Sequence, residues 1–266
     1  MKIIVIGLGS IGNRHFNNLK ELGHDVIGID INEEIDFSSH YDFAVIATPT
    51  ETHVSIANQF FEHGIPCFIE KPIAETEEQL NLIKPYKVIN MVACNLRFTN
   101  VISSIKKESK GILNIHSRVC DSSLFRTKYG DMILQDIHEF DYLSWIMGDI
   151  KHIDIIRGQN NKSYDAIILF ESGRTASVHG DMEAKSYHRS IFAETKYGNI
   201  NDDIDISNDM YVKQMQYFIE CVKEKTMPEN TVEQASKLTR RLLEAIHRCD
   251  NPSSHDIEKT FSKSFA

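Results

Sequence analysis

Short apolar runs alternate with amphipathic segments along the first hundred residues. The runs cover residues 2–6, 25–29, 43–47, 66–69 and 88–93. Runs of Ile and Val that are this short and this uniformly apolar are typical of parallel strands buried on both faces. Segments with helical patterning lie between them, and Gly23 and Gly64 stand where two of these helices would end. The alternation predicts an α/β fold with a doubly wound parallel sheet.

The pattern changes after Phe98. Helical patterning at residues 101–107, 136–147, 210–224 and 232–249 accompanies extended stretches at 112–119, 150–157, 165–170, 175–181 and 190–195. Turns at Gly173 and Gly198 separate neighbouring strands. The sequence therefore predicts two domains. Residues 1–98 form a Rossmann domain, and residues 99–266 form an α+β domain with a mainly antiparallel open sheet.

A glycine-rich turn, GLGSIG, follows the first predicted strand and opens a helix. Gly7 permits the tight turn, Gly9 lets a pyrophosphate approach the backbone, and Gly12 lets helix and strand pack closely. The helix start at Ser10 and Ile11 then offers free N–H groups to the phosphates. A glycine turn in a methyltransferase or another α/β domain is the alternative, but the surrounding strand, helix and following acid favour a dinucleotide.

Asp30 ends the second predicted strand. A carboxylate at this place accepts hydrogen bonds from the adenosine ribose and repels a 2′-phosphate, so we expect NAD in preference to NADP. A surface acid at a strand end is the alternative interpretation.

Polar residues follow the later strands, and all parallel strands end at the same edge of the sheet. These residues are Thr48, Pro49, Thr50, His53, Glu70, Lys71, Asn95 and Arg97. Lys71 lies between a buried strand and Pro72, so its backbone is stiff. Its ammonium could bind a substrate hydroxyl, stabilise an alkoxide or pass a proton. Taken alone, the tripeptide fits a solvated surface lysine better.

A second polar cluster stands at the predicted helix start near residue 136. Asp136 is expected at the N-cap, and His138 and Asp141 share a helix face. An imidazole titrates near neutral pH, which suits His138 to proton transfer. A structural histidine is the alternative. We predict no metal site, because the cluster holds one histidine and no second ligand pair.

Composition narrows the classes of partner. The chain has 266 residues and a net charge of −9, which argues against nucleic acid and anionic lipid as partners. None of the five cysteines forms a CxxC pair, so free thiols are expected. The N-terminal apolar run is too short for a signal peptide, and no stretch is long enough to span a membrane. We expect a cytoplasmic protein.

The ordered set of motifs resembles the Gfo/Idh/MocA oxidoreductases, a family named after glucose–fructose oxidoreductase, inositol dehydrogenase and a rhizopine-catabolism protein. The matching segments are GLGSIGNRH at 7–15, Asp30, ATPTETH at 47–53, EKP at 70–72, NLRF at 95–98 and HEFDYLSWIMG at 138–148. The resemblance implies an NAD(P)-dependent oxidoreductase that transfers hydride between nicotinamide and a carbinol carbon of a sugar-type substrate. The HEFDY variant is similar to a subgroup associated with amino sugars and bacterial surface polysaccharides.

The resemblance also assigns roles to residues. Lys71 and His138 would be catalytic, with Asp136 as a third candidate, and Lys71, Asn95, Arg97 and His138 would line the substrate. The cofactor would contact Gly7, Gly9, Ser10, Ile11, Gly12, Asp30, Thr48, Pro49, Thr50, His53, Glu70 and Lys71.

Two departures from the family pattern qualify this assignment. Leu134 and Gln135 stand where the family often carries an Asp, so proton transfer could rest on Lys71 and His138 alone. Little chain separates Cys120 from Gly130, so the pocket would be open or completed by a partner chain. A homodimer or homotetramer through the C-terminal sheet is expected.

Two other functional interpretations stay open. One is a catalytically silent NAD-binding regulator or scaffold with the same fold. The other is an enzyme acting on a nucleotide sugar, for which the candidate anionic anchors are Arg118, Arg126, Lys128, Arg157, Lys185 and Arg189.

Overall fold

A computed structural model describes residues 1–30, 32–84, 87–120, 131–158 and 161–252. The chain divides into two compact units. The first consists of residues 1–107 and 204–239, and the second of residues 108–203 together with residues from 240 onward. The sequence-based boundary at residue 98 lies close to this division, but residues 204–239 return to the first unit.

The first unit contains a five-stranded, wholly parallel sheet in the order β2-β1-β3-β4-β5. The strands are β1 (Lys2–Ile6), β2 (Asp25–Ile29), β3 (Phe43–Ile46), β4 (Cys67–Ile69) and β5 (Asn90–Val92). The predicted doubly wound parallel sheet is thereby confirmed. Because the strand order reverses direction at β1, the glycine turn after β1 lies at a switch point of the sheet, where ligands bind in such folds.

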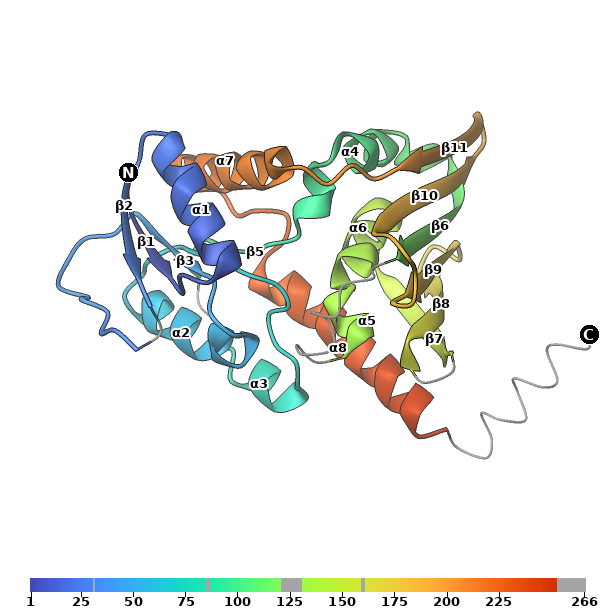
Figure 1. The fold of residues 1–266 in the computed structure, drawn as a ribbon, viewed down its shortest axis with the longest axis horizontal. Coiled ribbons are helices and arrows are strands. Elements are labelled where there is room, and N and C mark those ends of the chain that lie inside the picture. Colours follow the sequence, from blue (N-terminus) through green and yellow to red (C-terminus); the bar gives the residue numbers. More distant parts are fainter. Residues whose placement is uncertain (31, 85–86, 121–130, 159–160, 253–266) are drawn as a thin grey trace, which may run out of the picture. The chain divides into compact units, whose positions relative to one another are not determined.

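Helices connect these strands and cover the sheet (Figure 1). The elements of this unit are α1 (Ser10–Glu21), α2 (Thr50–Glu62), α3 (Glu77–Asn81), η1 (Asn95–Phe98), α4 (Asn100–Lys107) and α7 (Asn208–Glu224). The helix α8 (Val232–Asp250) begins here and ends in the second unit.

Helix α7 joins the first unit because its apolar face completes the core of that unit. Met215, Phe218 and Ile219 belong to the same buried cluster as Val5 and Phe43 from the parallel sheet. Figure 1 shows the late helix α7 beside the early helix α1, and the two helices are in contact. Local sequence patterning predicts the helix but not the core that it completes.

The second unit contains a six-stranded sheet in the order β11-β10-β6-β9-β8-β7. Its strands are β6 (Ile112–Cys120), β7 (Ile150–Arg157), β8 (Ser163–Phe170), β9 (Thr175–Asp181), β10 (His188–Thr195) and β11 (Gly198–Asp203). All pairings are antiparallel except β6 with β9. The predicted, mainly antiparallel sheet is confirmed, and β11 is an addition to it.

The helix predicted at residues 136–147 is α6 (Ile137–Met147), and a short helix that was not predicted, α5 (Met132–Gln135), precedes it. Asp131 caps α5, since its carboxylate accepts a 2.8 Å hydrogen bond from the backbone N–H of Ile133. Asp136 stands at the junction and makes no capping hydrogen bond. Asp136 thus occupies the predicted N-cap position of α6. Its carboxylate has other partners, which are described below.

Two further expectations concern membranes and disulfides. None of the helices in the described residues is long and apolar enough to cross a membrane. All five cysteines are free thiols, as expected.

Candidate active site

The glycine turn between β1 and α1 has the geometry that its sequence predicts. Gly7 has φ +87°, and a Cβ there would lie 2.7 Å from the carbonyl oxygen of Ala47. A Cβ on Gly12 would lie 1.8 Å from the carbonyl oxygen of Gly7. At Gly9, by contrast, a Cβ would meet nothing within 4 Å. The turn is tight on its protein side and open at Gly9, where a pyrophosphate would approach.

The start of α1 suits an anion electrostatically. Its first turn holds no acidic residue, and Ser10 at its beginning is exposed. Free N–H groups and the positive end of the helix dipole are therefore available to phosphate. These features of the chain fit a dinucleotide in this turn.

Asp30 lies at the carboxyl end of β2, exposed, as the ribose-binding role requires. Its backbone N–H donates a 2.7 Å hydrogen bond to Oε1 of Glu33. The carboxylate of Glu33 thus adds a second negative charge next to Asp30, which strengthens the expected discrimination against a 2′-phosphate.

His53 is buried, with 1% of its surface exposed. Its Nδ1 lies 2.9 Å from the carbonyl oxygen of Pro72, and its Nε2 lies 2.8 Å from that of Thr48. Burial lowers the pKa of His53, although the two carbonyls oppose that shift. Its ring joins the turn after β3 to the turn after β4, and contact of His53 with the cofactor stays a prediction.

Lys71 follows β4, is partly exposed, and precedes Pro72 across a cis peptide bond. Its backbone N–H donates a 3.2 Å hydrogen bond to Oε2 of Glu70. The other carboxylate oxygen of Glu70, Oε1, lies 2.7 Å from Nε2 of His15 on α1. The turn that carries Lys71 is thus connected through one carboxylate to the helix that follows the glycine turn.

Asn95 begins η1 at the same sheet edge and is buried. Its side chain hydrogen-bonds the phenol of Tyr211 on α7, and its Oδ1 has no hydrogen-bond partner among the described residues. Arg14 lies over the ring of Tyr211 at 4.5 Å. Burial and the charge of Glu70 raise the pKa of Tyr211. Sequence reasoning did not single out Tyr211, because nothing in its local pattern distinguishes it from other helix residues.

In the first unit most of the residues predicted to contact cofactor or substrate stand at one sheet edge. Gly7, Gly9, Ser10, Ile11, Gly12, Asp30, Thr48, Pro49, Thr50, Glu70, Lys71, Asn95 and Arg97 all stand at or just after the carboxyl ends of its strands. Asp136 and His138 belong to the second unit.

The second unit holds a buried charged cluster around the start of α6. Arg189 on β10 forms an ion pair with Glu139, and its Nη2 lies 3.9 Å from Oδ1 of Asp136. Tyr164 donates a 3.2 Å hydrogen bond to Oδ2 of Asp136. Burial opposes the charge of Arg189, but the carboxylates of Glu139 and Asp136 raise its pKa above the usual value. Arg189 therefore stays charged and fixes both carboxylates that flank His138.

His138 and Asp141 lie on α6 and are both buried, with 9% and 2% of their surfaces exposed. Among the described residues, no group of three or more His, Cys, Asp and Glu side chains could hold a metal ion.

Several candidate anionic anchors are occupied within the protein. Arg157 forms ion pairs with Asp131 and, at 2.9 Å, with Asp250. Arg189 forms the buried ion pair with Glu139 that is described above. Arg126, Lys128 and the short segment 121–130 lie outside the described residues. Arg157 and Arg189 therefore bind acidic side chains of the chain itself instead of a substrate phosphate.

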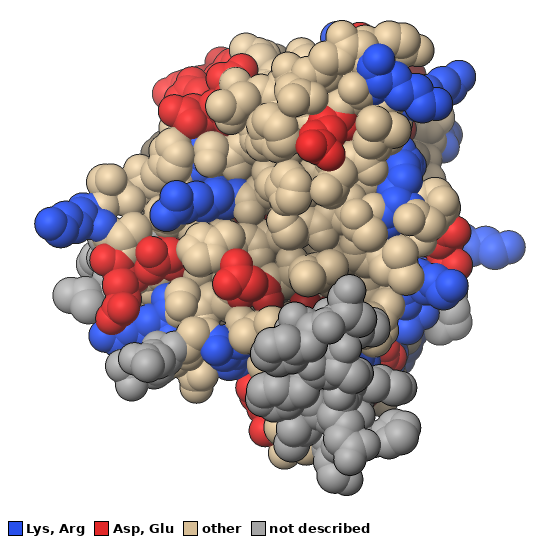
Figure 2. All heavy atoms as spheres, turned by 90° about the vertical axis from the view of Figure 1, so that its right-hand side faces the viewer, with Lys and Arg blue, Asp and Glu red and all other residues tan. Residues whose placement is uncertain are grey.

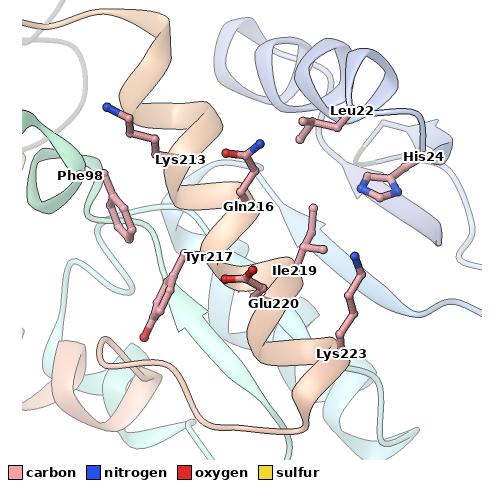
Figure 3. A pocket seen from close by; sticks show the side chains of 9 residues that line it. All are labelled: Leu22, His24, Phe98, Lys213, Gln216, Tyr217, Ile219, Glu220 and Lys223. Atoms are coloured by element: carbon pink, nitrogen blue, oxygen red, sulfur yellow. The ribbon is translucent and has the colours of Figure 1, made fainter.

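A hollow of about 620 Å³ on the first unit lies away from the glycine turn (Figure 3). Its lining comes from α7, from Phe98, and from Leu22 and His24 beyond the carboxyl end of α1. The glycine turn is at the other end of α1. None of the residues that line this hollow was predicted to bind cofactor or substrate.

Comparison with known proteins supports the predicted resemblance. Residues 29–92 match the family model described as the GFO_IDH_MocA oxidoreductase family with an NAD-binding Rossmann fold. The rhizopine catabolism protein MocA of Rhizobium meliloti is 29% identical over 121 residues, which are 40% of this chain. The match spans 38% of the length of that relative.

Solved structures resemble the chain along most of its length. A putative myo-inositol dehydrogenase from Sinorhizobium meliloti has a TM-score of 0.80 at 17% identity and covers 95% of this chain and 98% of its own. The UDP-N-acetylglucosamine 3-dehydrogenase GnnA from Acidithiobacillus ferrooxidans has a TM-score of 0.79 at 15% identity and covers 92% and 96%. At these identities the likeness shows the fold. The family resemblance, the fold class and the NAD-binding Rossmann assignment predicted from the sequence are confirmed.

Proposed function

We propose that this chain, with its sequence match to the Gfo/Idh/MocA oxidoreductases and its NAD-binding Rossmann fold, is an NAD-dependent sugar or polyol dehydrogenase. The observation that carries the proposal is the placement of Lys71 at the same sheet edge as the glycine turn, on a turn connected by Glu70 and His15 to α1. A binding scaffold has no need to fix a lysine there.

NAD would supply the hydride acceptor at C4 of its nicotinamide. The residues of the chain that fit it are Gly9, which leaves room for the pyrophosphate, the start of α1 at Ser10, and Asp30 for the adenosine ribose. The side chain of Asn95 adds a buried acceptor oxygen for a polar group of cofactor or substrate.

Lys71 is proposed to act on the reacting substrate hydroxyl. Oxidation breaks the carbinol C–H bond, whose electron pair leaves with the hydride, and the O–H proton must leave as the carbonyl forms. Lys71 would stabilise the developing oxyanion, and a role of His138 in accepting the proton stays a prediction from the family resemblance. Asp136 is held by Tyr164 and Arg189, so we assign it the positioning of α6 instead of a direct role.

The proposed substrate is a polyhydroxylated ring: a sugar, an amino sugar, a nucleotide sugar or a cyclic polyol. The structurally similar proteins named above carry inositol and UDP-N-acetylglucosamine dehydrogenase names. Participation in surface-polysaccharide metabolism stays a prediction from the HEFDY variant.

The experiment that tests the function is a panel of inositols, free sugars, amino sugars and UDP-sugars, followed by the absorbance of reduced nicotinamide. We expect NAD reduction with at least one member. Tight NAD binding with no reduction by any member would instead support the silent scaffold.

Cofactor choice is expected to depend on Asp30. Replacing Asp30 with serine removes the ribose acceptor and one negative charge, so we expect NADP affinity to rise and NAD affinity to fall, each by about tenfold. Titration of both cofactors by the fluorescence of their reduced forms checks this. The matched control is Asp25→Ser, at the other end of β2. Equal effects of the two variants would contradict the role of Asp30.

We also propose that two copies associate through the outer face of the second sheet. Ile156 on β7 and Ile167 on β8 expose 60% and 58% of their surfaces on adjacent strands. Figure 2 shows a broad region with few charged side chains on the side of the molecule where this sheet lies. The same face also carries Asp154 and Asp165, whose exposed carboxylates pair with His152 and His179, so the proposed interface combines exposed isoleucines with histidine–carboxylate pairs.

The association is tested by one charge placed on that face. Ile167→Lys is expected to weaken self-association at least about tenfold, because association would then remove water from an ammonium in place of an apolar side chain. Light scattering during size exclusion measures the change. Leu82→Lys, at a residue of the first unit with 59% exposure, is the control. A wild-type chain that is monomeric at all concentrations, or an Ile167→Lys variant that associates like the control, would refute this interface.

A further inference from the structure

We propose that His15 and Glu70 form a positioning pair that fixes the backbone of Lys71 relative to the dinucleotide helix α1. The proposal rests on the proposed function, because it assigns the pair to the placement of the reacting lysine. It concerns contacts within the first unit only.

The contacts form a continuous path from α1 to Lys71. Nε2 of His15 lies 2.7 Å from Oε1 of Glu70, and a carboxylate only accepts, so the imidazole donates. Oε2 of the same carboxylate accepts a 3.2 Å hydrogen bond from the backbone N–H of Lys71. Each carboxylate oxygen of Glu70 thus accepts one hydrogen bond, Oε1 from His15 and Oε2 from Lys71.

The surroundings of the pair keep it in one geometry. His15 has 0% of its surface exposed, and its ring meets Phe68 edge-on at 5.2 Å and Tyr211 at 6.1 Å. The backbone N–H of Glu70 donates a 2.8 Å hydrogen bond to the carbonyl of Ile46, which continues the sheet past the last residue of β4. Hydrogen bonds to a charged group are stronger than neutral ones and persist best where water is excluded.

The location of the His15–Glu70 pair gives it a role in placing Lys71 as well as in packing. His15 lies on the helix whose first turn would receive the pyrophosphate, and Glu70 is the neighbour of Lys71 in the chain. A rigid path between them sets the distance from the bound cofactor to the lysine. Misplacement of a reacting group by about 1 Å costs up to about 100-fold in rate. Loss of the pair should therefore lower kcat more than it weakens cofactor binding.

The test compares two replacements of His15. In His15→Gln the amide N–H can replace Nε2 as the donor to Glu70, whereas His15→Leu has similar bulk and no donor. We expect His15→Leu to lower kcat about tenfold or more, with NAD affinity changed less than about threefold, and His15→Gln to recover most of the loss. His40→Leu, at a histidine whose side chain is 80% exposed, is the control. If His15→Leu does not fold, Glu70→Gln, which keeps an acceptor for the N–H of Lys71, takes its place.

A second readout needs no substrate. The rate at which an amine-reactive reagent modifies Lys71, followed by peptide mass spectrometry across pH, reports the surroundings of its ammonium. We expect His15→Leu to displace this profile and His15→Gln and His40→Leu to leave it near that of the wild type. An unchanged profile in a folded, NAD-binding His15→Leu variant would overturn the proposal. Failure of the wild type to oxidise any sugar would sink the proposed function but leave this readout intact.

Discussion

Replacing Lys71 with alanine is expected to lower kcat by about 100-fold to 10,000-fold while NAD still binds. Removal of a group that stabilises developing charge at the reacting atom has effects of this size. NAD affinity should change little, because the proposed pyrophosphate and ribose contacts are at Gly9, Ser10 and Asp30. Stopped-flow turnover and cofactor titration on the same preparation separate the two effects.

Two further variants make the Lys71 experiment specific. Lys71→Arg keeps the positive charge, but its planar guanidinium does not present a compact ammonium to one oxyanion, so it should also turn over slowly. Lys87→Ala, at an exposed lysine of the same unit, should match the wild type. A Lys71→Ala variant that oxidised its sugar at the wild-type rate would contradict the mechanism.

The second large effect is expected at the glycine turn. Substitution of Gly12 should lower stability, and substitution of Gly9 should weaken cofactor binding. Gly12→Ala places a Cβ 1.8 Å from a backbone oxygen, which only a shift of the turn relieves. We expect a loss of about 3 kcal/mol or more in the free energy of unfolding. That is a large share of the roughly 5–15 kcal/mol by which most domains are stable.

Gly9→Ala should fold like the wild type, because its φ of −67° suits any residue and its Cβ meets nothing. Its methyl group would stand where the pyrophosphate approaches, so we expect NAD affinity to fall about tenfold or more. Denaturant unfolding and NADH titration of both variants check the pair of predictions. The account fails here if Gly9→Ala binds NAD as tightly as the wild type, or if Gly12→Ala is as stable.

The first sheet was predictable because each of its strands is marked by a short apolar run in the sequence. Short apolar runs predicted β1 to β4 nearly to the residue. Strand β11 was not predictable in this way, since Gly198–Asp203 is mostly polar and mostly exposed. The return of α7 to the first unit depends on contacts with strands far away in the sequence, which periodicity does not encode.

In the candidate site, too, features marked by local motifs were predictable and features that depend on distant contacts were not. The turn-forming glycines, Asp30 and Lys71 could be proposed as site residues because ordered motifs mark them. The contacts around them are long-range: His15 meets Glu70 across 55 residues, and Glu139 meets Arg189 across 50. His15, Glu70 and Arg189 were named from the sequence, but local patterning did not predict which residues pair.

The central claim is that hydride moves from a carbinol carbon of a sugar or polyol to nicotinamide. It is tested most directly by turnover of an active substrate deuterated at its carbinol carbons, with mass spectrometry of the recovered cofactor. The account predicts NADH that carries one deuterium and forms more slowly than from the unlabelled substrate. Unlabelled NADH, or bound NAD that is never reduced, would contradict it.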